Sequence, residues 1–236
     1  MRKVWWIAKK ELDLYFVSPI AYIVLFVLSL ISGYYFYIFV FQVKDAVVIM
    51  PYLFSLLASI FLFMSPFYTM RLIAEEKKTG TIEVLLTSPI SKGEIVVGKF
   101  LGSFLFFSLL LSVTFLYLLV LIIWGSPDFG VILANYIGFF LLGASFISLG
   151  LVASSLTKNQ IIAAILTFLF LLLFWLIGWI SSFFQGGLKS FFNYFSLIEH
   201  FTNFNRGIID STDLIFFLSV VTFNLFLTSK ILSHEE

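Results

Sequence analysis

The chain has 236 residues, of which 61% are hydrophobic and 11% are charged, and its formal net charge is +1. A soluble domain of this size could not bury that much apolar surface in one core. The composition therefore excludes a soluble globular protein and indicates a polytopic membrane protein. The absence of cysteine excludes disulfides and cysteine-based metal sites. The balanced charge gives no sign of nucleic-acid binding, and we expect no nucleic-acid partner.

The N-terminal residues 1–19 combine aromatic and charged side chains. Trp5 and Trp6 are adjacent, and Lys9 and Lys10 follow one turn later. Tryptophan and lysine together suit a helix at a membrane surface, so we predict an N-terminal interfacial helix; the alternative is a simple cytoplasmic tail. The charges also interrupt the apolar run that a cleavable signal peptide needs, so we expect no such peptide.

Six apolar runs are long enough to cross a bilayer as helices. We expect transmembrane helices at residues 20–40, 52–70, 100–124, 131–151, 161–180 and 214–231. The predicted fold is therefore an all-α polytopic membrane protein. The only Asp, Glu, Lys, Arg or His in these runs is Lys230, which can reach the surface near the end of the last run. Ion-coupled transporters and membrane enzymes usually carry such groups within the bilayer, so both classes are disfavoured.

Lysine and arginine are distributed unequally between the two ends of these predicted helices. Eleven lie on the side that would include the N-terminus, and three lie on the other side: Lys44, Lys189 and Arg206. The positive-inside rule therefore predicts that both termini and the segment between the second and third spans are cytoplasmic.

That segment, residues 71–99, is rich in charge. Nine charged side chains lie in it: Arg71, Glu75, Glu76, Lys77, Lys78, Glu83, Lys92, Glu94 and Lys99. Since one charge at the bilayer centre costs about 2.5 to 3.5 kcal/mol, the segment must lie in water. We predict that it prolongs the second span as a charged helix ending at Gly80. A second short helix is expected to begin at Thr81 and to end at Ser88-Pro89.

Residues 93–99 have the glycine and lysine spacing of a nucleotide-binding P-loop. Phe100 stands where serine or threonine would hold magnesium, and no soluble strand precedes the segment, so we expect no ATP binding by this chain. Ser91 and Glu94 instead have the spacing of a capping box that opens a helix. Gly98 and Lys99 would then lie at the membrane surface.

An outer segment, residues 183–213, precedes the last span. Its polar side chains follow helical spacing on one face: Lys189, Asn193, Ser196, His200 and Asn203. Apolar side chains occupy another face, so we predict a helix that lies in, or dips back into, the outer leaflet; the alternative is a packed loop. A lipid-acting membrane enzyme would need clustered acids or histidine here. The only candidates are Glu199, His200, Asp210 and Asp213, which we interpret as a polar face and a helix cap.

Small residues occur at helix-contact spacing in the fourth span and its continuation. They are Ala144 with Ser148, and Gly150 with Ser154. Such pairs let helices approach closely, either within one bundle or between two copies, and packing within the bundle is the default interpretation.

The segment GTIEVLLTSPIS, followed by EIVVGKFLG and preceded by TMRLIAEEK, resembles the cytoplasmic loop of permease subunits of type 2 ABC exporters, especially the gliding-motility-type branch. The resemblance extends to KELDLYFVSPIAYI near the N-terminus, to SGYYFY, and to HFTNFNRGIIDSTDL before the last span. It implies a multi-pass permease of the cell's inner membrane that pairs with a second permease, identical or paralogous. Two separate ATPase subunits would bind ATP and magnesium.

The resemblance also implies that residues 71–99 form the coupling loop that docks on the ATPase. The residues expected at or near that contact are Arg71, Glu75, Glu76, Gly80, Thr81, Glu83, Pro89 and Glu94. The sequence thus predicts a permease subunit without catalytic residues or bound cofactors, most easily an exporter of hydrophobic or amphipathic cargo. The alternatives are a membrane scaffold or channel without an ATPase, and a lipid-acting membrane enzyme.

Overall fold

The computed structural model describes residues 2–43, 46–86, 89–181 and 183–233. All regular structure in these residues is helical, and six runs of helix are long and apolar enough to cross a membrane. The predicted all-α polytopic class is confirmed. In chain order the helices are α1 (Arg2–Val17), α2 (Pro19–Val43), α3 (Ala46–Thr69), α4 (Ala74–Thr79), α5 (Thr81–Leu86), α6 (Lys92–Ser112), α7 (Thr114–Trp124), α8 (Phe129–Ser155), α9 (Gln160–Ser181), α10 (Gly187–Phe195), α11 (Leu197–Asn205) and α12 (Ser211–Ser233).

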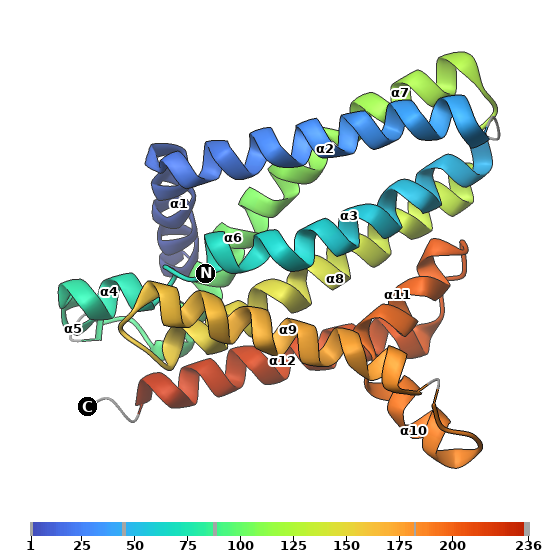
Figure 1. Ribbon diagram of the computed structural model, residues 1–236. Coiled ribbons are helices and arrows are strands. Elements are labelled where there is room, and N and C mark those ends of the chain that lie inside the picture. Colours follow the sequence, from blue (N-terminus) through green and yellow to red (C-terminus); the bar gives the residue numbers. More distant parts are fainter. Residues whose placement is uncertain (1, 44–45, 87–88, 182, 234–236) are drawn as a thin grey trace.

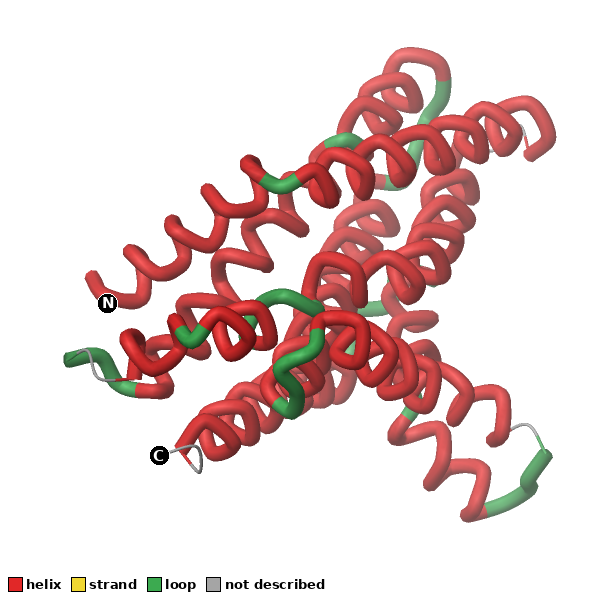
Figure 2. The backbone as a smooth tube through the Cα atoms, turned by 60° about the vertical axis from the view of Figure 1, so that its left-hand side comes forward, coloured by secondary structure: helices red, strands yellow, loops and turns green. Residues whose placement is uncertain are grey.

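The long helices run side by side, and the short ones gather at the two ends of the bundle (Figure 1). Helices α1, α4 and α5 lie at the end that also carries both termini, which we call the inner end. Helices α10 and α11 lie at the opposite, outer end, and Figure 2 shows the same helical bundle from another side. Lys44, counted above on the outer side, and Ser88 fall outside the described residues.

Helix α8 is the centre of the bundle. In its most apolar stretch of membrane length, 83% of the residues are buried, against 17% to 44% in the other five spans. Glycine allows the close approach: a Cβ atom at Gly143 would lie 2.4 Å from the Phe107 ring, and one at Gly150 would lie 2.4 Å from Thr69 Oγ1. Because α8 contacts helices on several sides, a displacement of α8 would reach most of the bundle.

The second span differs from its predicted form. We expected one charged helix continuing to Gly80, but α3 ends at Thr69, and a turn over residues 70–73 separates it from α4. Leu72 and Ile73 in this turn are fully buried. The turn therefore packs into the protein interior, which a helix continuing straight into water could not do.

The outer segment also differs from the predicted single helix. Ser196 adopts an extended backbone conformation between α10 and α11, and its hydroxyl accepts a hydrogen bond from the Glu199 amide at 3.2 Å. This cap starts a second helix in a new direction. The predicted polar face is therefore interrupted, and His200 is buried instead of exposed.

Candidate functional site at the inner end

A buried ion cluster joins three helices at the inner end. Lys99 Nζ on α6 lies 3.1 Å from Glu11 Oε2 on α1 and 2.9 Å from Glu76 Oε2 on α4. The Lys99 side chain is only 2% exposed. Lys10 Nζ, on a largely exposed side chain, lies 3.5 Å from Glu76 Oε1. Buried charges are tolerated only when they are paired, so this Lys99 cluster (Lys99, Glu11, Glu76 and Lys10) depends on all three helices being in place.

Helix α1 sits closely on α6 over two glycines, which leave no room for side chains. A Cβ atom at Gly98 would lie 2.7 Å from Ile7 Cβ, and one at Gly102 would lie 2.6 Å from Glu11 Cβ. Gly98 and Lys99, predicted at the membrane surface, are thus covered by α1. Two glycines four residues apart are a known helix-contact spacing, and this signal could have located the contact from the sequence.

The segment with P-loop spacing is helical throughout. Helix α6 begins at Lys92, and the Lys99 ammonium is engaged by two carboxylates. The predicted capping box is confirmed: Ser91 Oγ accepts from the Glu94 amide at 3.2 Å, and Glu94 Oε2 accepts from the Ser91 amide at 2.9 Å. A continuous helix cannot wrap its amides around a phosphate as a P-loop does.

Arg71 fastens the turn after α3 to the junction between α1 and α2. Its guanidinium donates to Ser18 Oγ at 2.6 Å and to the Leu14 carbonyl at 3.1 Å, and it lies 5.3 Å from the centre of the Tyr15 ring. The Tyr15 hydroxyl in turn donates to the Tyr68 carbonyl at 2.9 Å. Burial raises the pKa of Tyr15 well above its usual range, so the phenol remains a neutral donor.

Helix α4 is also attached to the end of α8. Ser154 Oγ accepts hydrogen bonds from the Ile73 and Ala74 amides, both at 3.0 Å, and donates to the Met70 carbonyl at 2.9 Å. The Lys77 ammonium donates to the Ser155 carbonyl. One side of α4 is therefore bonded to α8, while Glu76 on another side reaches α1 and α6.

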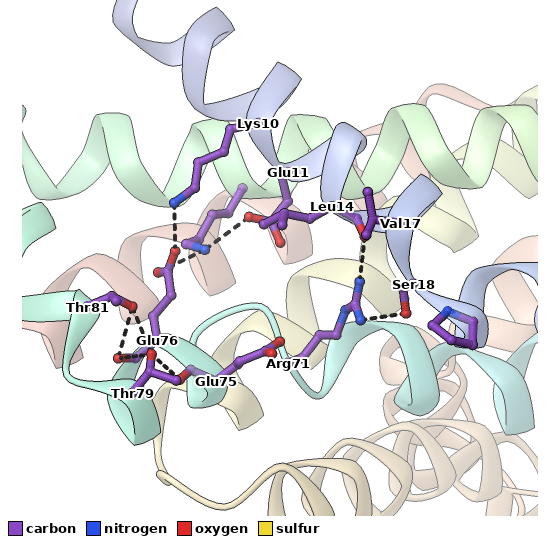
Figure 3. Close-up of a pocket in the computed structure, with 12 residues that line it drawn as sticks. Lys10, Glu11, Leu14, Val17, Ser18, Arg71, Glu75, Glu76, Thr79 and Thr81 are labelled. Atoms are coloured by element: carbon purple, nitrogen blue, oxygen red, sulfur yellow. Dashed lines mark hydrogen bonds and ion pairs between the residues drawn. The ribbon is translucent and has the colours of Figure 1, made fainter.

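A cleft of about 460 Å³ opens between α1 and the α4–α5 pair (Figure 3). Its lining combines the ion cluster with nearby polar and apolar groups: Lys10, Glu11, Leu14, Val17, Ser18, Pro19, Arg71, Glu75, Glu76, Thr79, Thr81 and Lys99. Thr79 and Thr81, whose hydroxyls lie 2.9 Å apart, stand at the α4–α5 end of this cleft.

The eight residues expected to contact an ATPase divide into two groups. Five are exposed: Glu75, Gly80, Thr81, Glu83 and Pro89. Gly80 has a positive φ of 74°, which lets the chain turn sharply between α4 and α5. We call the surface made by Glu75, Gly80, Thr81 and Glu83 the α4–α5 tip.

The other three expected contact residues are engaged within the chain. Arg71 bonds to the α1–α2 junction, Glu76 belongs to the Lys99 cluster, and Glu94 caps α6. Sequence position alone did not distinguish Glu76 from its neighbour Glu75, because nothing local to α4 reveals the buried partner on α6.

The small residues predicted for helix packing are buried against other helices of the same chain. Asn224 Nδ2 donates to Ser148 Oγ at 3.0 Å, which joins α12 to α8. Gly150 faces Thr69 of α3, Ser154 caps α4, and Ala144 is 9% exposed.

A second buried polar cluster lies at the outer end. His200 Nδ1 is 2.5 Å from Asp213 Oδ1, and Asn203 donates to Asp213 Oδ2 at 3.0 Å. His200 Nε2 lies 3.0 Å from the Tyr194 carbonyl, which can only accept, so this nitrogen carries a proton. The imidazole also stacks on Phe216, with ring centres 3.9 Å apart.

This outer cluster buries His200, which was predicted on a polar face, whereas Asp213 lies in the first turn of α12 as predicted. Both nitrogens of His200 are occupied by protein atoms, which is the arrangement of a structural histidine more than of a catalytic base. Asp210 does cap the start of α12, accepting from the Thr212 amide at 2.8 Å, and that hydrogen bond lowers the pKa of the carboxyl. Glu199 remains exposed. Among the described residues, no three His, Asp or Glu side chains gather as a metal-binding group.

Residues 44–212 match the family model described as ABC-2 family transporter protein. No curated protein matches the chain. The matched range includes the α4–α5 tip, Lys99 and Glu76, whereas α1 with Glu11 precedes it.

Proposed function

Since the chain belongs to the ABC-2 family of transporter proteins, we propose that it is a permease subunit that works with a separate ATPase docking on the α4–α5 tip. ATP and magnesium would bind to that partner, and this chain would supply the membrane path without catalysing a reaction itself. The inner end, with both termini, would face the cytoplasm of a cell whose inner membrane the six spans cross.

The α4–α5 tip is the observation that carries this proposal. The tip presents acidic and hydroxyl side chains, while other residues of α4 bond to α1, α6 and α8. A surface that is exposed yet firmly connected to membrane spans suits a soluble partner whose movement must reach the bundle.

The contacts of α4 indicate how a push on the tip would travel. The turn at residues 70–73 interrupts the path along α3, so the two helices do not form one continuous lever. The bonds from Ser154 and Ser155 lead instead into α8, the central helix. Displacement of α8 would then repack its neighbours, as small shifts of packed helices do in other switching proteins.

Several finer assignments complete the proposal. The transporter would be an exporter of the gliding-motility-type branch, containing a second permease that is an identical copy or a paralogue. Membrane lipid would cover the exposed apolar faces, and the cargo would be hydrophobic or amphipathic, because the middle of each described span carries no Asp, Glu, Lys, Arg or His. A scaffold or channel without an ATPase is the competing function.

Affinity purification of the tagged chain from its native cell, in mild detergent, tests the proposal. We expect a soluble subunit with a complete P-loop to co-purify in stoichiometric amount. The double substitution Glu75→Ala with Glu83→Ala should reduce its recovery at least tenfold. Glu199→Ala, an exposed acid at the outer end, is the matched control and should leave recovery unchanged. A stable complex without any ATPase would favour the scaffold or channel instead.

Gly80→Pro offers an independent variant at the same tip. Proline cannot adopt the positive φ of Gly80, so the turn between α4 and α5 must change while the spans are untouched. ATP-dependent transport should be lost although the protein still inserts and melts at close to the normal temperature. Glu76 is excluded from this test, because removing it would disturb the Lys99 cluster as well.

A further inference from the structure

We propose that the Lys99 cluster locks α1 and α4 to the start of α6, so that the N-terminal helix moves together with the α4–α5 tip as one body during coupling. This inference rests on the proposed function for the source of the movement. The lock itself is a property of this chain alone, and it assigns Glu11, Glu76 and Lys99 as positioning residues.

Neither α1 nor α4 is joined to the other by a short stretch of chain. The covalent link of α1 to the bundle is the Ser18 junction with α2, and its main packing surface is α6 at Gly98 and Gly102. Helix α4 is likewise separated from α3 by a turn. Glu76 therefore supplies a direct tie between two elements that the chain itself does not hold together.

The geometry makes Glu76 the shared member of the cluster. Its Oε2 atom contacts Lys99, which is also paired with Glu11 of α1, and its Oε1 atom contacts Lys10 of α1 directly. Glu76 is thus tied to α1 by two routes: a buried one through Lys99, and a partly exposed one through Lys10 directly. Movement of α4 by itself would break both routes.

The charges decide which movement is favourable. Lys99 is 2% exposed, so it cannot turn to water when a carboxylate leaves. Withdrawing Glu76 would leave Lys99 and Glu11 as the remaining buried pair and would expose Glu76 without its partner. Joint movement of α1, α4 and the start of α6, which carries Lys99, keeps every pair intact, and breaking a buried pair is strongly unfavourable.

The consequence is a second route from the tip to the membrane. Helix α1 exposes Trp5 and Trp6, side chains that favour the membrane surface, and Arg71 ties the end of α1 to the turn before α4. A push on the tip would therefore shift α1 along the membrane surface, in addition to the route through α8.

A variant that removes the whole cluster separates this role from simple stability. The triple substitution Glu11→Gln, Glu76→Gln and Lys99→Met removes all three buried charges at similar volume, so it should fold, whereas Lys99→Met alone leaves two buried carboxylates without their cation. If the cluster serves only stability, the neutral triple should fold and hold α1 against α4 as the native chain does. If the cluster is a lock, the neutral triple should fold but no longer hold α1 to α4.

The first measurement uses the isolated full chain in lipid nanodiscs. Because the sequence has no cysteine, spin labels can be placed at Asp13→Cys on α1 and Lys78→Cys on α4, both exposed, without background. We expect a narrow distance distribution in the otherwise native chain and at least a twofold broader one in the neutral triple. Lys9→Met, an exposed charge on α1, is the control and should not broaden it. An unchanged distribution in the triple would overturn the lock.

The second measurement uses the complex with the co-purified ATPase. Labels at Asp13→Cys and Lys158→Cys report α1 against the inner end of the bundle. ATP should shift this distance in the native cluster and not in the neutral triple. If ATP is hydrolysed in the native complex but α1 stays still, the lock plays no part in coupling and the proposed function survives. If no ATPase is found, the proposed function fails, while the nanodisc measurement still decides the lock.

Discussion

The two ends of the molecule each bury a cluster of polar side chains, but the clusters join very different parts of the chain. At the inner end, Lys99 and Glu11 are 88 residues apart, and Lys10 and Glu76 are 66 apart. At the outer end, His200 and Asp213 are only 13 residues apart. The inner cluster therefore fixes the relative position of three distant helices, whereas the outer one closes a local connection between α11 and α12.

This difference predicts different consequences for the same kind of damage. Breaking the inner cluster removes a contact between helices that no short stretch of chain connects. Opening the outer cluster should loosen the segment around α11 and leave the remaining helices packed. Local and long-range cooperativity can thus be tested separately in one protein.

Lys99→Met should have the largest effect. It leaves Glu11 and Glu76 at a buried site without their shared cation, and we expect a loss of about 3 to 5 kcal/mol in the free energy of unfolding. Denaturant unfolding in detergent measures this. Lys78→Met, an exposed lysine on α4, is the control and should change stability by less than about 0.5 kcal/mol. Equal effects of the two substitutions would contradict the importance of the cluster.

His200→Leu should come next, at about 3 kcal/mol, because Asp213 keeps the Asn203 amide when the imidazole is lost. The loss should be local. Hydrogen exchange is expected to rise in residues 187–205 and to remain unchanged in α1 and α6, with Glu199→Gln as the exposed control. Faster exchange across the whole bundle would remove the distinction between the two ends.

Gly102→Ala should cost about 1 to 3 kcal/mol by overpacking the contact between α1 and α6. The added methyl would lie 2.6 Å from Glu11 Cβ and 2.7 Å from the Ala8 carbonyl oxygen, so α1 must shift. Gly93→Ala, in the first turn of the same helix, meets no atom within 4 Å and serves as the control. Thermal unfolding of both variants would compare them; a tolerated Gly102→Ala would argue against close seating of α1.

Ser154→Ala should have the smallest effect of the series, about 1 kcal/mol, by removing the cap of α4. The amides of Ile73 and Ala74 would lose their acceptor, which should raise hydrogen exchange in residues 70–79. Ser112→Ala removes an exposed hydroxyl from α6 and should alter neither stability nor exchange. No change at residues 70–79 would mean that α4 does not depend on α8.

The sequence by itself determined the features that depend on nearest neighbours along the chain. Six apolar runs gave the six spans, because a bilayer requires about twenty apolar residues in a helix. Ser91 and Glu94 determined the start of α6, and Gly80 the turn before α5, since capping and positive φ are local requirements.

Tertiary structure decided where the charges beside those runs would go. Glu75 and Glu76 are adjacent in the sequence, yet one is exposed and the other is buried against Lys99. His200 was expected on a polar face and instead packs against Asp213. A charged side chain near a span looks like a surface residue until a partner from another segment neutralises it. That partner exists only after the helices have packed, so no local pattern around Lys99, Glu76 or His200 could reveal it.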